Sequence, residues 1–486
     1  PVNMRPWWWV AAGLLGALFV LVGLNLDLFG LLERPAAGWV VAFTLPGYAL
    51  LLLAWWRLGP GWERPRLTAA LWGLPLFLAL PMHSRDAYAY AAAGWHAARG
   101  VDPYRVPLGE AGQPGLLVGA HWTGTTSVYP SLQLDVFAVL SRLTGGDLFW
   151  TTVALRLPSV AALAILALVL PALARRMGVD ERWALWAGWV NPVLLVQWIG
   201  GAHNDALMVA LAMAALLAAT DVGWRGWRGL VVGGVLLGLA MGIKQSAALF
   251  GLGLVAVAWA ARLPGYGPVG APPAEGRDAR PVEPAATLVP GWSGWPRLAA
   301  AAVVPGAVTV GVFLLTSLSW GLGWRNPTAG SPAEAVSLAP LSWAAAGLRA
   351  AGVAGETVNA LVTAVSAVLI VTGIAWVWVR LGPRGLSTRA AASRGAPLEE
   401  RGDPLPFLAA VLAVACVAGP ALQPWYATWL IPVVALCVVP RRAWLVGVAA
   451  LLLLPALQDV LPPPLALLAL APLAFALRRP RAQISA

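Results

Sequence analysis

Side chains able to do chemistry are concentrated in five short stretches of an otherwise apolar sequence. The sharpest is HSRDAYAYAAAGWHAARGVDPY, residues 83–104, in which Asp86 directly follows an apolar run. A carboxylate there would lie at a membrane boundary, where ionisable groups are costly and by default indicate function. The other four stretches are GGAHNDALM (200–208), Lys244-Gln245, GWRNPTAGSPAEAVSLAPLSW (323–343) and LQPWYATW (422–429).

These residue types together favour one kind of chemistry. A carboxylate such as Asp86 can act as a general base and take a proton from an attacking hydroxyl. Lys244, the only lysine, interrupts an apolar stretch and can hold an anion. A carboxylate, a cation and the faces of Tyr and Trp rings that can stack on a sugar together suit sugar transfer from a polyprenyl phosphate. The sequence has no clear Asp-x-Asp pair of the kind that binds a metal. His83 and His96 lack metal-ligand spacing, so neither histidine is assigned to the site.

Each of these residues also has a simpler structural interpretation. Trp425 can anchor a helix end at the membrane interface, and Lys244 can snorkel to the headgroups. His203 alone is more typical of a structural histidine, and Asn204–Asp205 can cap the following helix. Asp86 can likewise cap the helix after it. Because capping and substrate binding can coexist, the sequence leaves both interpretations open.

The composition indicates what must position these groups. The chain has 486 residues, of which 59% are hydrophobic and 11% charged, against about 25% charged in a soluble domain. Its net charge of +11 does not indicate nucleic acid as a partner, because the basic residues lie between apolar runs rather than in one stripe. Cys416 and Cys437 each lie within an apolar segment and predict neither a disulfide nor a metal site.

Apolar runs near the bilayer-spanning length of about 20 residues recur from end to end. They predict an all-α polytopic membrane protein of one domain, 1–486, with about fourteen (12–14) transmembrane helices. The pair 229–243 and 246–262 could be one bent helix or two crossings. The predicted spans are 7–24, 38–56, 67–82, 149–174, 182–200, 205–220, 229–243, 246–262, 298–320, 357–379, 405–422, 425–439, 443–458 and 462–477.

Arginine placement predicts the orientation. With both termini in the cytoplasm, most of the 32 basic residues fall on the cytoplasmic side, as the positive-inside rule describes. The Pro-, Gly- and charge-rich segments 263–296 and 381–403 then become flexible cytoplasmic loops. Residues 83–148 form a large extracytoplasmic loop, in which 128–144 reads as an amphipathic helix on the membrane surface. All five polar stretches share that extracytoplasmic face of the plasma membrane.

Several motifs resemble a known family. Asp86 followed by Tyr residues and GVDPY (100–104) is similar to the first outer loop of the GT-C glycosyltransferases. The closest resemblance is to the actinobacterial polyprenyl-phosphomannose-dependent α-1,6-mannopyranosyltransferases, of the MptA/MptB type, and covers about residues 70 to 440. The further motifs are VYPSL (128–132), RLPS (156–159), NPVLLVQWIGGAHNDALMVAL (191–211) and QPWYATWLIP (423–432). Pro130-Ser131 departs from the family's double proline or Gly-Pro and affects local helix entry.

The resemblance implies a GT-C fold and an inverting transferase. It would move mannose from polyprenyl-phosphate mannose to a lipid-linked α-1,6-mannan, as in lipomannan synthesis, at the extracytoplasmic face. Asp86 would be the catalytic base, with no cofactor and no metal; membrane lipids would be partners and nucleic acid would not. The predicted donor-phosphate ligands are Lys244, Arg85 and Arg156, and the predicted sugar or acceptor ligands are Tyr88, Tyr90, His203, Asn204, Asp205, Gln423, Trp425 and Tyr426.

Two alternatives remain at this stage. The same fold could transfer another lipid-phosphate sugar, such as arabinose or glucose. A transporter or flippase would be a different class, but transporters commonly show internal repeats and a site at the bilayer midplane. The sequence shows no repeat, and its polar stretches lie at one face.

Overall fold

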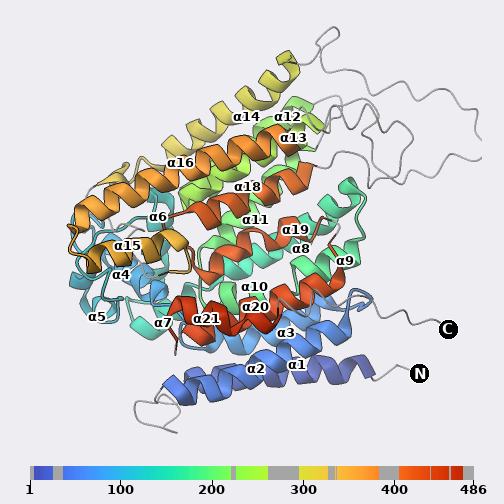
Figure 1. Ribbon diagram of the computed structural model, residues 1–486, viewed down its shortest axis with the longest axis vertical. Helices are drawn as coiled ribbons and strands as arrows, with labels where there is room; N and C mark the ends of the chain where they lie inside the picture. The colour runs from blue at the N-terminus through green and yellow to red at the C-terminus, as the bar shows by residue number, and fades with distance from the viewer. Residues whose placement is uncertain are drawn as a thin grey trace, which may run out of the picture.

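The computed structural model describes residues 5–25, 37–220, 226–260, 295–326, 334, 337–382, 404–437, 439–458 and 461–473. Within these ranges every regular element is a helix, and the longer helices lie side by side in a bundle (Figure 1). The predicted cytoplasmic loops 263–296 and 381–403 fall almost wholly outside the described residues.

Five helical segments in the described ranges are long and apolar enough to cross a membrane. They are Pro6–Leu24, Gly38–Leu58, Leu148–Met177, Gly355–Leu381 and Arg441–Gln458. Shorter apolar helices of 10–17 residues accompany them. The prediction of an all-helical membrane fold is therefore confirmed, whereas the count of about fourteen spans is not.

Two predicted spans, 182–200 and 425–439, are each divided into short helices. Proline contributes in both, because Pro192 and Pro432 stand in the first turn of a new helix, where the missing N–H is tolerated. The first segment contains α9 (Glu181–Gly188), α10 (Pro192–Leu194) and the π-helix η2 (Leu195–Gly200), and the second contains the 3-10 helix η7 (Pro424–Trp429) and α19 (Ile431–Val434).

Small residues bring the first two helices together. In the packing of α1 (Arg5–Leu24) on α2 (Ala37–Leu58), a β-carbon added at Gly16 would lie 2.6 Å from the Gly47 carbonyl oxygen. Close backbone approach at glycine is typical of helix pairs in membranes. Because lipid is as apolar as the helices, van der Waals packing rather than the hydrophobic effect holds such pairs together.

The centre of the bundle is α11 (Asp205–Ala219). It packs against α8 (Leu157–Met177) on one side and α12 (Gly226–Ile243) on another. Further out, α14 (Trp295–Thr316) covers α12, and α16 (Gly355–Leu381) pairs with α18 (Pro404–Ala418). The N-terminus of α11, which carries the His-Asn-Asp motif, is therefore held within the protein.

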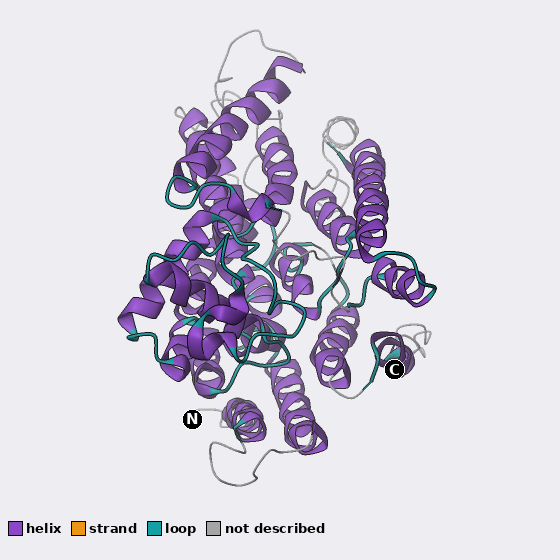
Figure 2. Cartoon of the chain, turned by 90° about the vertical axis from the view of Figure 1, so that its left-hand side faces the viewer, coloured by secondary structure: helices purple, strands orange, loops and turns teal. Residues whose placement is uncertain are grey.

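The predicted outer loop 83–148 folds over one end of the bundle. It contains α4 (Asp86–Ala98), η1 (Leu108–Glu110), α5 (Gly112–Gly115) and α6 (Ser131–Leu143), and ends at α7 (Leu148–Ala154). Figure 2 looks onto this end, where many of the connecting loops gather. Helices α4 and α6 pack closely, since a β-carbon at Gly94 would lie 2.6 Å from the Phe137 carbonyl oxygen. The predicted helix within 128–144 is confirmed as α6.

Candidate active site

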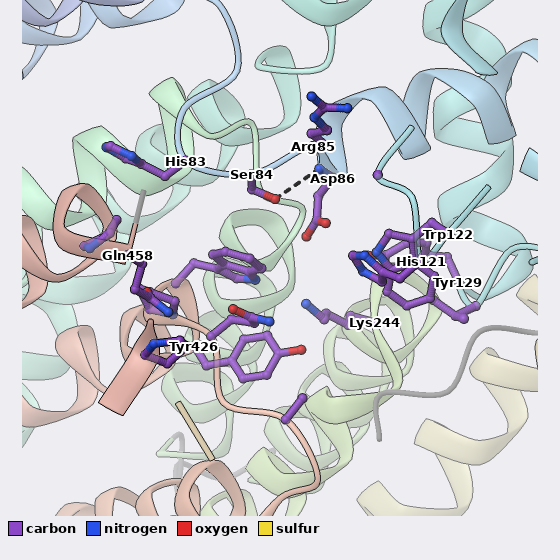
Figure 3. A pocket seen from close by; sticks show the side chains of 18 of the residues that line it. His83, Ser84, Arg85, Asp86, His121, Trp122, Tyr129, Lys244, Tyr426 and Gln458 are labelled. Carbon is purple, nitrogen blue, oxygen red and sulfur yellow. Dashed lines mark hydrogen bonds between the residues drawn. The ribbon is translucent and has the colours of Figure 1, made fainter. Parts of the chain in front are cut away.

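A cavity of about 940 Å³ opens at the end of the bundle that the outer loop covers. It brings together segments that are hundreds of residues apart in sequence, including four of the five polar stretches (Figure 3). Two further helices, α20 (Arg441–Gln458) and α21 (Pro463–Ala469), complete it. Its lining comes from residues 83–86, Gly119, His121, Trp122, Val128, Tyr129, Lys244, Gln245, Trp324, Ala421, residues 423–426, Pro455, Gln458 and residues 461–463.

Asp86 begins α4 and directs its carboxylate into the cavity (Figure 3). The turn before it is tight: His83 has a left-handed φ of 54°, and the Ser84 hydroxyl accepts the Asp86 backbone N–H at 3.0 Å. Burial raises the pKa of the Asp86 carboxyl from 3.8 to about 6, although the Lys244 ammonium opposes the shift. A side chain that is still 20% exposed and has a pKa close to neutrality is well suited to general base catalysis.

Lys244 stands at a break in the helical chain. It is extended, with φ −154° and ψ 127°, and separates α12 from η3 (Gln245–Ala247) and α13 (Ala248–Ala260). Within the described part of this segment, residues 229–260, the chain therefore forms two helices rather than one. Lys244 Nζ lies 2.7 Å from Asp205 Oδ1 and 5.1 Å from the centre of the Tyr426 ring, so the cation is held between a carboxylate and an aromatic face.

The His-Asn-Asp motif lies behind the wall of the cavity. Asp205 is fully buried and accepts from the Lys244 ammonium and from Trp429 Nε1, the latter at 2.5 Å. Asn204 Oδ1 accepts from the Tyr90 hydroxyl at 3.4 Å. Neither of these two predicted sugar ligands lines the cavity. Asp205 supports Lys244, which does line it, whereas Asn204 contacts Tyr90, which does not.

His203 lies directly beside the predicted base. Its ring is fully buried and stacks on Trp425 with centroids 4.2 Å apart. Its Nδ1 is 3.9 Å from Asp86 Oδ2, and neither ring nitrogen has a hydrogen-bond partner among the described residues. The residue before it, Ala202, has a left-handed φ of 54°. Strained backbone of this kind clusters at functional sites.

The other predicted sugar ligands divide into two groups. Gln423, Trp425 and Tyr426 line the cavity, as predicted for residues that meet a substrate. Tyr90 is buried and stacks on Phe137 at 4.9 Å, and neither it nor Tyr88 is part of the lining.

The predicted phosphate ligands also separate. Lys244 faces the cavity, and Arg85 lines its edge, on the side of Asp86 away from Lys244 (Figure 3). Arg156 is fully buried outside the lining and donates only to backbone carbonyls in the described contacts. These belong to Ala79, Thr152, Ile199 and Gly200. The structure thus gives Arg156 a structural position, and its predicted contact with the donor has no support.

Several lining residues were not assigned from the sequence. His83, set aside for lack of metal spacing, lines the cavity and is hydrogen-bonded to the Tyr48 hydroxyl. His121 and Trp122 lie in a turn and carry no periodic signal that could have identified them. Trp324 lies in the 3-10 helix η4 (Gly323–Arg325). It falls within the polar stretch 323–343, and Tyr129 falls within the VYPSL motif, so these two stretches were the usable signals.

No group of three His, Cys, Asp or Glu side chains in the described ranges is placed to hold a metal ion. Metal independence nevertheless remains a prediction.

The fold and the site together define the class: a helical membrane protein with a deep cavity in which a carboxylate, an ammonium and aromatic rings face a common space. The family model of the alpha-(1→6)-mannopyranosyltransferase N-terminal domain matches residues 9–261. The alpha-(1→6)-mannopyranosyltransferase A of Mycobacterium tuberculosis is 31% identical over 414 residues, which cover 82% of this chain and 71% of that protein. The chain therefore belongs to this family of mannosyltransferases.

Two further relatives agree. A second alpha-(1→6)-mannopyranosyltransferase of M. tuberculosis is 29% identical over 471 residues, covering 85% of this chain and 73% of the relative. The alpha-(1→6)-mannopyranosyltransferase A of Corynebacterium glutamicum is 31% identical over 250 residues, covering 48% of this chain and 49% of the relative. No solved structure matches.

Proposed function

We propose that the protein is an inverting α-1,6-mannosyltransferase that uses polyprenyl-phosphate mannose as donor and a lipid-linked α-1,6-mannan as acceptor. The reaction takes place at the extracytoplasmic face of the plasma membrane, and both chain termini lie in the cytoplasm. The single observation that carries the proposal is the placement of the Asp86 carboxylate and the Lys244 ammonium on the same cavity, at the end that the outer loop covers. The family relationship supports mannose over arabinose or glucose.

The reaction is a single displacement. Asp86 takes the proton from the acceptor 6-hydroxyl as that oxygen attacks the anomeric carbon of the donor mannose. The new C–O bond forms on the face opposite the phosphate, the bond between the anomeric carbon and the phosphate oxygen breaks, and the electron pair leaves on polyprenyl phosphate. A raised pKa favours this role, because the carboxyl group can accept a proton near neutral pH.

Lys244 stabilises the leaving phosphate. Its ammonium has three donors, and Asp205 occupies one of them. The remaining donors can meet phosphate oxygens from a side chain that is 13% exposed. Asp205 neutralises part of this charge. Arg85, the other predicted phosphate ligand on the lining, lies on the side of Asp86 away from Lys244, so the two cations do not form one phosphate site.

The direct test is Asp86→Asn in purified full-length protein given radiolabelled polyprenyl-phosphate mannose and a synthetic α-1,6-mannoside acceptor. Loss of a general base lowers kcat by about 10²–10⁴-fold. Asp147→Asn is the matched control, because Asp147 caps α7 outside the cavity and asparagine caps equally well.

The same assay tests the donor. Polyprenyl-phosphate arabinose and polyprenyl-phosphate glucose should give little transfer. If wild-type protein does not transfer mannose, or if Asp86→Asn retains the wild-type rate, the proposal is wrong.

A further inference from the structure

The two ends of the active-site cavity differ in chemistry and in origin. His121, Trp122 and Tyr129 lie on one side and Gln458 on the other, with Asp86 between them (Figure 3). The first end is built from the outer loop, and the second from the junction of α20 and α21. A transferase that joins two substrates needs an entrance for each, so the two ends can be assigned separately.

The end at α20 and α21 is suited to a hydrocarbon chain. Leu461, Pro462 and Pro463 line it. On α21 itself, Leu465 and Leu468 are 50% and 66% exposed, which gives this helix an apolar surface suited to contact with lipid. An isoprenoid chain can therefore run from the bilayer along this apolar wall without crossing water.

The opposite end is suited to a saccharide. Trp122, Tyr129 and Trp324 line it, and none of them belongs to a long apolar helix. His121, beside Trp122, is exposed. Aromatic rings with a polar edge offer a flat apolar face together with a hydrogen-bonding group, which matches the C–H face and the hydroxyls of a pyranose.

One donor at this end has no partner. Trp324 Nε1 is buried and makes no hydrogen bond within the described part of the chain. The neighbouring Trp320 shows the contrast, because its Nε1 donates to Asp135 Oδ1 at 2.8 Å. Buried polar groups in native proteins are generally paired. Trp198, Trp259 and Trp444 also have unpaired indole N–H groups within the described residues, but of these four tryptophans Trp324 is the one that lines the cavity, where a ligand oxygen could pair with it.

The position of Trp324 is fixed by the outer loop. The Tyr104 hydroxyl donates to the Tyr129 carbonyl at 2.6 Å, and Asn326 Nδ2 donates to the Tyr104 carbonyl at 3.4 Å. Gly323 lies against the Tyr104 ring so closely that a β-carbon there would overlap it. Tyr104 thus ties together two segments about two hundred residues apart, so the aromatic end is arranged before a ligand arrives.

We propose that this aromatic end binds the non-reducing terminus of the acceptor saccharide, with Trp324 Nε1 donating to a sugar hydroxyl and the Trp122 ring packing on the sugar face. The donor isoprenoid occupies the α20–α21 end. The two substrates therefore meet at Asp86 from opposite sides. This assignment rests on the proposed function and adds to it the location of each substrate.

The test uses Trp324→Phe, which keeps an aromatic ring and removes the N–H. Full-length protein in detergent is titrated calorimetrically with octyl α-1,6-dimannoside, and KM is measured for this acceptor and for the donor. Loss of one buried hydrogen bond should weaken acceptor binding by about tenfold, with the donor KM unchanged. Trp320→Phe is the matched control, because it removes an indole N–H that donates to Asp135, and neither residue lines the cavity. This variant should leave acceptor binding and the donor KM unchanged.

The opposite end is tested by Leu461→Trp, which narrows it. This variant should raise the donor KM and leave acceptor binding unchanged. The assignment is overturned if Trp324→Phe binds the dimannoside as wild type does, or if it raises the donor KM instead. Failure of the proposed function looks different, since wild-type protein would then transfer no mannose while the Trp324-dependent binding of the dimannoside persisted.

Discussion

The ion pair between Lys244 and Asp205 allows a quantitative prediction. Asp205 is fully buried, its Oδ1 contacts the Lys244 ammonium at 2.7 Å, and its Oδ2 has no partner in the described part of the chain. Lys244→Met therefore leaves a buried carboxylate without its cation. Breaking such a pair costs about 3–5 kcal/mol in the free energy of unfolding.

The reverse substitution should cost less. In Asp205→Asn the amide oxygen can still accept from Trp429 Nε1, and the Lys244 ammonium is 13% exposed and can turn toward water in the cavity. We expect a loss of about 1–2 kcal/mol. The double variant Lys244→Met with Asp205→Asn has no buried charge left and should lose only about as much stability as Asp205→Asn alone, which gives a coupling energy of about 3–5 kcal/mol.

The assay is unfolding of purified protein in mixed micelles, driven by increasing SDS and followed by circular dichroism, for the wild type, both single variants and the double variant. The cycle separates the pair from other effects of each substitution. A coupling energy below about 0.5 kcal/mol would refute the argument that Asp205 is retained as the buried partner of Lys244.

Three further predictions concern the base, the buried arginine and the helix contact under the site. The kcat/KM should fall tenfold per pH unit below about pH 6, because the pKa of Asp86 is raised from 3.8 to about 6 and only the ionised carboxylate accepts a proton. A pH profile of kcat/KM that begins to fall only near pH 4 would contradict this prediction. Arg156→Met should lower the free energy of unfolding by at least about 3 kcal/mol, while surviving protein keeps the wild-type donor KM; a raised KM would restore its phosphate-binding role. Gly94→Ala should weaken the packing of α4 against α6 and lower the free energy of unfolding by about 1–3 kcal/mol in the same SDS titration. Gly347→Ala in α15 (Pro340–Ala350) should not lower it, because a β-carbon added at Gly347 meets no neighbouring atom within 4 Å.

Much of the site was accessible from the sequence because charge is conspicuous in an apolar chain. Asp86 and Lys244 each interrupt an apolar run, and both reach the cavity. The same reasoning gave the all-helical membrane fold. It left the number of spans unconfirmed, since a run such as 425–439 is largely apolar, yet Pro432 stands in the first turn of a new short helix within it.

What the sequence could not supply is the direction in which a long side chain extends. Arg156 belongs to a motif similar to the family's, yet its guanidinium turns into the protein toward carbonyls that are far away in the chain. His121 lies in a turn and Trp324 in a three-residue 3-10 helix, and only the tertiary arrangement brings them to the cavity. Their roles depend on contacts between distant segments, which no local pattern records.

The buried arginine also explains how such a site can exist inside a membrane protein. Asp86 and the His-Asn-Asp motif both follow turns in which helices end, and each turn has a non-glycine residue in the left-handed region, His83 and Ala202. Ended helices leave carbonyl groups that must be satisfied internally, because a bilayer offers no water. Arg156 donates to the carbonyls of Ala79, where α3 (Pro65–Leu78) ends before the first turn, and of Ile199 and Gly200, where η2 ends before the second. One guanidinium therefore joins the two turns that present the base and its neighbours, so its removal should disturb the geometry of Asp86 without touching the substrate.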